Sequence, residues 1–478
     1  MIVLTFVVFP SIAVRAKKRK KNALCLAAAA DVADEARGLL AKGDADSACE
    51  LLRAELDKNP DGGNAGTLNS LLGDAELMKG NRAAAREAYN RATKRGVADA
   101  YRGLGRIGMQ EYDFSRAAAD FAKYTELKNN AKKPADPAVE QERKTALNAV
   151  QHLRRVDDVV ILDSIDMPRQ SFFEAYKLPP SSGRLLTADR TPNPDEMTSH
   201  SAFINEQQDF MLLGVTDTVA ESKPLEYIRL NTGEWQPAEV DSTLYIGNFD
   251  YPFMMPDGQT LYFASDGDLS IGGLDIFMAT RDPEDDSYMP PVNLGMPYNS
   301  PFDDFMMAID DEHNVGWFAT DRNSPGGDVT VYMFIPNEIR RNLDPDSVDI
   351  AARARIADFR ATWPEGADYT ELLEKVAAID PDAAPKESIF FPLGDGTAVT
   401  DPDDFNDDAR EFYQQYIAAE SELADVTGKL REMRTRYHDR PSERLRDEIL
   451  GAEAAQERYR EQMRRLRSQT VRTQLRRN

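Results

Sequence analysis

Residues 261–266 read Leu-Tyr-Phe-Ala-Ser-Asp, and residues 316–321 read Gly-Trp-Phe-Ala-Thr-Asp. Each is a short apolar and aromatic run that ends at an aspartate, as expected of a strand followed by a turn. A glycine pair follows each run, at 272–273 and 326–327, and a second strand-like run comes next, at 275–278 and 329–332. Residues 157–340 are therefore predicted to form tandem antiparallel β units of roughly fifty residues.

Phe203, Phe253 and Phe305 stand 50 and 52 residues apart and indicate three such units. Tandem four-stranded units of this length are typical of β-propeller blades, but closed propellers usually have at least four. Here two units are clear and a third, from Phe203 to Trp235, is weaker. We expect closure to use a strand at 158–163 and a late strand at 389–391; otherwise the sheets form an open arc against the helices.

Two motifs carry a family resemblance. The run 255–266, followed by Gly272-Gly273-Leu274-Asp275-Ile276, resembles the WD-like propeller repeat of TolB-type periplasmic proteins. Residues 293–305 resemble the inter-blade link of the version common in Bacteroidetes envelope proteins, where the propeller often follows tetratricopeptide repeats. The resemblance implies an all-β WD-like propeller, small or incomplete, at 157–340.

A different repeat precedes the β units, at residues 28–156. The matched positions are Ala36 with Gly73 and Gly105, Ala48 with Ala85 and Ala117, and Leu52 with Tyr89 and Phe121. Small residues let paired helices approach closely, and the large residue fills the gap between pairs. The pattern resembles the tetratricopeptide repeat, which implies an all-α solenoid closed by a capping helix at 138–156; a generic alanine-rich bundle is the alternative.

In the tetratricopeptide family the first helix of each pair lines a concave groove that holds a peptide or partner segment. Matched by repeat position, Ser70, Asp74, Arg102 and Arg106 would face this groove. These four residues are the candidate partner-binding residues, although any solvated helix carries side chains of these types.

Residues 341–404 read as a connector with short helices and a possible closing strand, and residues 405–478 as a C-terminal helical segment. A heptad seam runs through Phe412, Tyr416, Ala419, Leu423, Val426, Leu430, Met433 and Tyr437. A break at 439–442 separates it from a second stripe. This pattern predicts an antiparallel helical hairpin or a self-associating coiled coil. The arginine-rich end, 456–478, is a solvated helix face or a contact for an acidic partner.

Residues 1–16 form a short apolar run ending in small residues, which predicts a cleaved signal peptide and export to the periplasm or outer membrane, with no transmembrane span in the mature chain. The alternative is a buried strand. The chain has a net charge of −24, and residues 157–408 hold 50 acidic and 15 basic side chains. Such a balance disfavours nucleic-acid binding.

The sequence offers little catalytic chemistry: its four histidines lie outside any metalloprotease motif, and we predict no catalytic residues and no cofactor. Asp266, Asp268 and Asp275 are oxygen donors on one stretch and form a weak calcium candidate; otherwise they cap turns. We therefore expect a non-catalytic envelope scaffold that binds other proteins or peptides and oligomerises through 405–478. The alternative is a glycan- or glycopeptide-recognising propeller, with or without hydrolysis.

Overall fold

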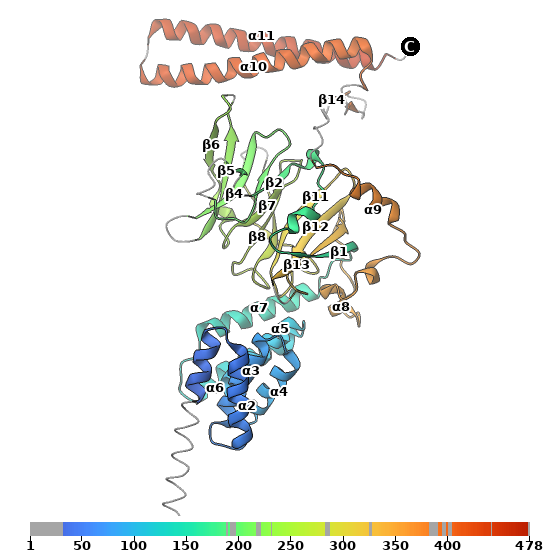
Figure 1. The fold of residues 1–478 in the computed structure, drawn as a ribbon. Coiled ribbons are helices and arrows are strands. Elements are labelled where there is room, and N and C mark those ends of the chain that lie inside the picture. The colour runs from blue at the N-terminus through green and yellow to red at the C-terminus, as the bar shows by residue number, and fades with distance from the viewer. Residues whose placement is uncertain are drawn as a thin grey trace, which may run out of the picture. The chain divides into compact units, whose positions relative to one another are not determined.

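The structure is a computed structural model that describes residues 32–187, 190–191, 197–216, 221–230, 232–282, 287–324, 327–381, 391–393, 398–399, 404–440 and 442–476. The chain divides into two compact units, Met1–Ala383 and Ala384–Asn478. The first holds helices followed by antiparallel sheets, and the second holds a short hairpin and two long helices (Figure 1). The predicted order of α, β and α segments is confirmed; the predicted signal peptide lies outside the described residues.

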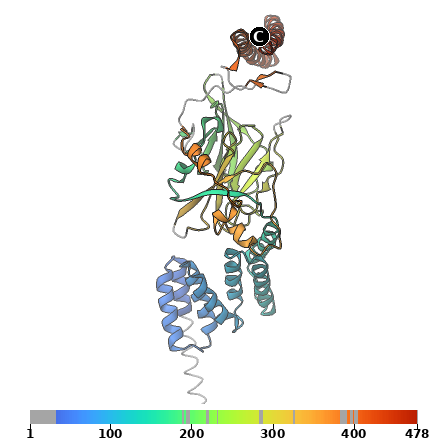
Figure 2. The same cartoon turned by 90° about the vertical axis from the view of Figure 1, so that its right-hand side faces the viewer.

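Seven helices that pack on one another in chain order open the described chain (Figure 2). A helix over 32–41 is followed by α2 (Ala45–Lys58), α3 (Ala65–Met78), α4 (Arg82–Thr93), α5 (Ala98–Gln110), α6 (Phe114–Asn130) and α7 (Pro137–Leu153). Side-chain caps fix three of the starts, where Asp44, Asp113 and Asp136 accept hydrogen bonds from backbone amides of the first turn. Helix α7 corresponds to the helix predicted at 138–156. No helix in the described part of the chain is both long enough and apolar enough to cross a membrane.

The small and large residues that repeat in the sequence pack against one another between the helices. Ala48, Ala85 and Ala117 are fully buried, and Leu52, Tyr89 and Phe121 are at most 1% exposed. The ring of Tyr89 lies against Gly73 of α3 and Gly103 of α5, and Phe121 lies against Gly105. A Cβ atom at any of these glycines would overlap the ring, so glycine is what allows the helices to approach this closely.

We expect Gly103→Ala to destabilise the first unit by about 1–3 kcal/mol, because the added methyl group overlaps the buried Tyr89 ring. Gly38 is the matched control. It lies in the helix over 32–41, where an added Cβ atom would meet nothing within 4 Å, so Gly38→Ala should stabilise by about 0.5–1 kcal/mol. Urea unfolding monitored by circular dichroism measures both, and equal effects from the two variants would contradict the packing argument.

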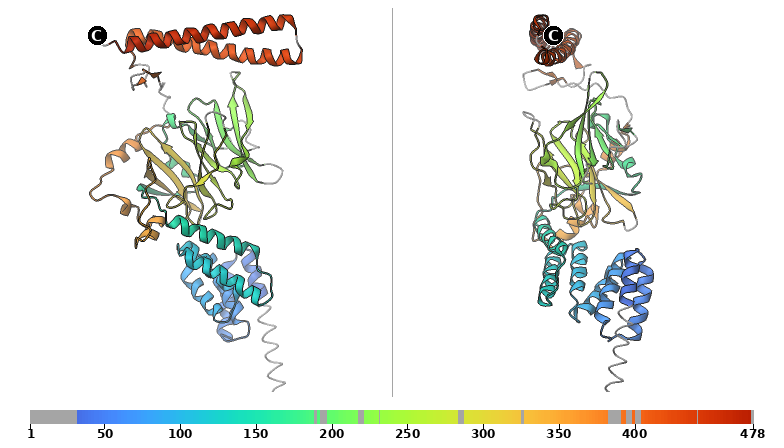
Figure 3. Two further views of the ribbon diagram at one scale, coloured as in Figure 1. Left: turned by 180° about the vertical axis from the view of Figure 1, so that it is seen from behind. Right: turned by 90° about the vertical axis from the view of Figure 1, so that its left-hand side faces the viewer.

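Three antiparallel sheets follow the helices (Figure 3). The first contains β2 (Arg184–Leu186), β3 (Ala202–Ile204), β4 (Phe210–Thr216), β5 (Ser222–Arg229) and β6 (Trp235–Glu239). The second contains β7 (Asp250–Met254), β8 (Thr260–Ser265), β9 (Asp275–Thr280) and β10 (Val292–Asn293). The third contains β11 (Asp304–Asp310), β12 (Val315–Thr320), β13 (Asp328–Ile335) and β1 (Val160–Pro168). Strand β7 contacts both the first and the third sheet, and one hydrophobic core spans all three.

The third sheet is completed by a strand from before the first sheet. β1 pairs antiparallel with β13 from Val160↔Ile335 to Pro168↔Asp328, which confirms the use of the predicted early strand. The predicted late strand does not close the sheets. Its described residue, Phe391, begins β14 (Phe391–Pro392), which pairs with β15 (Ala398–Val399) in the second unit; residues 389–390 lie outside the described residues.

Part of the predicted connector belongs to the β core. It forms α8 (Ile350–Arg355), the 3-10 turn η5 (Phe359–Thr362) and α9 (Thr370–Ala377). Ile161 of β1 donates its backbone N–H to Thr362 Oγ1 at 2.9 Å, and its carbonyl accepts from Trp363 Nε1 at 2.7 Å. Residues 359–379 also pack apolar side chains on the sheet core.

The strand register corrects one sequence correspondence. Phe203 and Phe253 occupy equivalent positions, since they pair with Leu212 and Tyr262 of the following strands. Phe305 instead pairs with Ala319 of the following strand. In the second sheet the residue that corresponds to Ala319 is Ala264, and Ala264 pairs with Asp250. Phe305 therefore takes the place of Asp250 in its sheet. Both strands carry a bulge with positive φ at the same place, at Tyr251 and Met306, so the residue equivalent to Phe253 is Ala308, which pairs with Trp317.

In the second unit, α10 (Asp407–Asp439) and α11 (Glu443–Gln474) form the antiparallel hairpin that the heptad seam predicts. Asn406 donates to Thr473 O near one end, and Arg434 pairs with Glu453 nearer the other. Ser442 caps α11 by accepting from Leu445 N. The self-associating alternative is not needed to explain the seam, because the two helices of one chain already pack along it.

Candidate partner-binding site

Helices α3, α5 and α7 share one face of the helical region, and three of the four predicted groove residues gather there. α3 packs against α5, and Arg102 of α5 reaches Glu142 of α7. Asp74 of α3 reaches solvent on this face and accepts a hydrogen bond from the Tyr89 hydroxyl at 2.7 Å. The surrounding protein excludes enough water to raise the pKa of Asp74 to about 6, although the Tyr89 hydrogen bond and the nearby charge of Arg106 oppose the rise.

Ser70 is not accessible on this face. It is 4% exposed and packed within the helical layer, contrary to the expectation from repeat position. Ser70 precedes Asp74 by four residues and so lies on the same side of α3, but the protein covers Ser70 there and leaves Asp74 exposed. Its hydroxyl is therefore not accessible to a partner.

Arg102 and Arg106 share one carboxylate. Arg102 donates from Nε and Nη2 to Glu142 at 2.9–3.2 Å and from Nη1 to Asp136 at 2.7 Å. Arg106 donates from Nε and Nη2 to Glu142 Oε1 at 3.2 and 2.7 Å, and its side chain is 51% exposed. Among the described residues its Nη1 has no hydrogen-bond partner. Arg102 is thus fully engaged, whereas Arg106 keeps donors that face solvent.

A pocket of about 420 Å³ lies beside Arg106, and we call it the junction pocket. Leu77, Met109, Phe121 and Ala138 line it from the helices, and Ile271 and Pro301 line it from loops of the sheets. The Arg106–Glu142 pair forms a polar side. Its volume falls in the range of ligand sites, and its apolar floor with a few polar groups has their usual composition.

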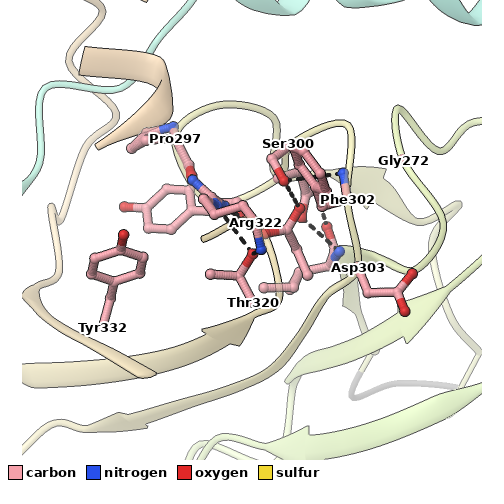
Figure 4. A network of polar contacts seen from close by, with 12 residues as sticks. Gly272, Pro297, Ser300, Phe302, Asp303, Thr320, Arg322 and Tyr332 are labelled. Atoms are coloured by element: carbon pink, nitrogen blue, oxygen red, sulfur yellow. Dashed lines mark hydrogen bonds and ion pairs between the residues drawn. The ribbon is translucent and has the colours of Figure 1, made fainter. Parts of the chain in front are cut away.

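Buried polar contacts fix the sheet side of the junction pocket (Figure 4). Arg322, 1% exposed, pairs with Asp304 at 2.5 Å and donates to the carbonyls of Pro297 and Tyr298 at 2.9 and 2.8 Å. The other Asp304 oxygen accepts from Ser300 Oγ at 2.6 Å. The segment that carries Pro301 is therefore held on both sides, and its backbone approaches Gly272 so closely that a Cβ there would overlap it.

We expect Arg322→Met to destabilise the first unit by about 3–5 kcal/mol, because it leaves the buried Asp304 carboxylate without its cation. Burial raises the pKa of Asp304 and the Arg322 charge opposes this rise, so the variant carboxyl should bind a proton more readily. Chemical denaturation measures the loss. Arg37→Met, which breaks an exposed pair with Asp34, is the control and should cost less than about 1 kcal/mol; a similarly small loss from Arg322→Met would contradict the argument.

The three candidate calcium ligands bind separate partners. Asp266 accepts from the backbone and side chain of Asn248 at 2.9 and 2.8 Å. Asp268 accepts from Gln141 at 3.3 Å, and Asp275 accepts from the amides of Ile271 and Gly272. These carboxylates therefore hold turns and loops in place. The described residues include no group of three or more potential protein ligands for a metal ion.

One of these contacts recurs in the neighbouring sheet. Asp321 accepts from Asp303 N at 2.9 Å in the third sheet, as Asp266 accepts from Asn248 N in the second. Asp266 follows β8 and holds the backbone just before β7. Asp321 follows β12 and holds the backbone just before β11. The aspartate that ends each repeated run thus has a structural role.

A stack of planar side chains at the starts of β7 and β11 was not predicted. The His200 ring lies parallel to Tyr251 at 5.3 Å, Tyr251 stacks on Phe305 at 4.6 Å, and Arg169 lies over Phe305 at 4.8 Å. Asp250 accepts from His200 Nδ1 at 2.5 Å and from the His200 amide at 2.7 Å. The stack joins β7 and β11 to the residues just before β3 and just after β1. Its residues are scattered through the sequence, and of these only Phe305 was singled out by the sequence spacing.

Two histidines predict opposite pH dependences of stability. The hydrogen bond to Asp250 raises the pKa of His200, so its stabilisation is present below the unfolded-state pKa of about 6.5 and is lost as the pH rises through the folded-state value. Burial lowers the pKa of His152 to about 4, so its stabilisation is present above about pH 6.5 and is lost as the pH falls towards 4.

We therefore expect His200→Asn to remove a gain in stability that the wild type shows as the pH falls to about 6. We expect His152→Asn to reduce the loss of stability that the wild type shows between about pH 6.5 and pH 4.5. The His200 effect should stay below about 1 kcal/mol, because the His200 side chain is 65% exposed. The His152 effect should reach about 2–3 kcal/mol at pH 4.5, because each unit by which the pKa is lowered is worth about 1.4 kcal/mol. Urea unfolding as a function of pH measures them. Parallel stability profiles for the two variants and the wild type would show that neither histidine has the assigned role.

Compared with models of known protein families and with curated proteins, the sequence gives no significant match.

Proposed function

We propose that this protein is a non-catalytic interaction scaffold of the cell envelope that holds a segment of a partner protein in the junction pocket. The observation that carries the proposal is the pocket itself. It has an apolar floor, one polar side and a wall fixed by buried ion pairing, and it lies where the helices meet two loops of the sheets. Such a preorganised concavity suits recognition of a peptide segment.

The helical region is proposed to be a tetratricopeptide solenoid. The support is the contact of Gly73 and Gly103 with Tyr89 and of Gly105 with Phe121, which reproduces the small and large pattern of that repeat. In such solenoids the first helices of successive pairs form the binding face. The equivalent helices here are α3, α5 and α7, which supply most of the pocket lining from the helical side.

The three sheets are proposed to be the blades of an incomplete WD-like propeller. The support is their antiparallel order, the contacts of β7 with both neighbours, and the repeated backbone contact of Asp266 and Asp321. The sheets would then offer a second surface. Two binding surfaces on one chain raise the effective concentration of one partner for another.

The glycan-recognising alternative gains no support from the aromatic side chains. Tyr251 and Phe305, near the starts of β7 and β11, are 1% and 0% exposed, and their neighbour Phe172 is 1% exposed. A sugar ring stacks on an exposed aromatic face, and these faces are covered by protein. We therefore favour a protein partner.

Export to the periplasm or outer membrane remains part of the proposal, and its support is the apolar run at 1–16 followed by five basic residues at 17–21. Cell fractionation of the full chain tests it. Recovery of the protein only from the cytosol would exclude an envelope role, whatever the pocket binds.

A site-specific photo-cross-linker tests the partner site. Ala138 is exposed and lines the pocket at the start of α7, so a cross-linker placed there should yield one discrete product with a second protein in intact cells. Glu87 of α4 is the matched control, since its side chain is 76% exposed and outside the pocket. Identical products from both positions, or no product from position 138, would contradict the proposed site.

A further inference from the structure

We infer that the junction pocket selects a partner segment in which a large apolar side chain stands next to a carboxylate, and that Arg106 is the residue that binds the carboxylate. This inference rests on the proposed function and adds the chemistry of the partner. It follows from the hydrogen bonds of the two arginines and from the composition of the pocket.

Arg106 has the donors that a carboxylate needs. Its Nε and Nη2 both point to one oxygen of Glu142, and Nη1 has no partner in the described part of the chain. A guanidinium binds a carboxylate best through two parallel N–H groups, so Arg106 is bound to Glu142 by less than its full capacity. With 51% of its side chain exposed, it can turn towards a ligand in the pocket.

Glu142 can release Arg106 without becoming an unpaired buried charge. Arg102 holds both Glu142 oxygens through Nε and Nη2, and these bonds do not involve Arg106. Release of Glu142 from Arg106 should cost little, because Arg106 is 51% exposed and the partly buried Glu142 keeps its bonds to Arg102. Glu142 thus occupies Arg106 in the free protein, and the ligand carboxylate replaces it.

The apolar part of the ligand fits the floor of the pocket. Leu77 and Met109 extend from the ends of α3 and α5, and Ile271 and Pro301 face them from the sheet loops. Residues 157–408 hold 50 acidic and only 15 basic side chains, and this negative charge would repel a partner that is acidic throughout. The partner segment therefore needs one local carboxylate rather than a run of acidic residues. We conclude that the apolar side chain and the carboxylate both contribute affinity, and that the carboxylate also fixes the position of the segment.

The test selects a phage-displayed library of random dodecapeptides against the full chain. A selected peptide is then synthesised with its acidic residue and with the corresponding amide, and both are titrated by fluorescence anisotropy. We expect the amide to bind about tenfold to a hundredfold more weakly to the wild type, the effect typical of a hydrogen bond to a charged group. Arg106→Gln should bind both peptides with equal affinity.

Two further variants separate the ways in which the test can fail. Arg95→Gln is the matched control, because Arg95 is 37% exposed and pairs with Asp61 outside the pocket; it should discriminate as the wild type does. Ala138→Trp fills the pocket and should abolish binding of both peptides. Unchanged thermal unfolding of Arg106→Gln verifies its fold.

If Ala138→Trp blocks binding but the wild type binds acid and amide equally, or if Arg106→Gln still discriminates, the carboxylate inference is overturned while the proposed binding site stands. If the selection yields no peptide whose binding depends on Ala138, both are overturned. A preference for acidic peptides that Arg106→Gln removes and Arg95→Gln retains supports the inference.

Discussion

The buried guanidinium of Arg322 is the constraint on which the pocket depends. A buried arginine is tolerated only when a carboxylate and hydrogen-bond acceptors surround it, and here Asp304, Thr320 and two backbone carbonyls do so. These acceptors lie on separate stretches of the third sheet and on the link before it. The hydrogen bonds that Arg322 requires therefore fix the segment between β10 and β11, and Pro301 in this segment lines the pocket.

The same region joins the helices to the sheets. Tyr112 and Phe114, at the start of α6, share a hydrophobic cluster with Ile271 and Met296 from the sheet loops. Ile271 belongs both to this cluster and to the pocket wall. The wall is thus held by apolar packing from the helical side and by buried polar contacts from the sheet side, which is the arrangement that keeps a binding site in one geometry.

Much of the architecture could be predicted because it is local or repeated. Of the candidate site, the sequence predicted some residues but not the contacts between them. The glycines and rings at 73, 89, 105 and 121 identify helix contacts, whereas the spacing of Phe253 and Phe305 matched two residues that strand pairing places at different positions. Repeat position placed Asp74, Arg102 and Arg106 on one face, but it also placed Ser70 there, because it does not show how neighbouring helices cover α3. The partner of the arginines, Glu142, lies 36 or more residues away, and contacts at that separation depend on how whole segments dock, which no local pattern encodes.

The hairpin of the second unit returns the polypeptide to its point of departure. Asn406, just before α10, is hydrogen-bonded to Thr473 near the end of α11, whereas Arg440 lies at the other end of α10, 33 helical residues away, a reach of about 50 Å. A fluorophore or affinity tag fused after residue 476 would consequently report on the base of the hairpin, and only a label attached near Arg440 would sample its far end.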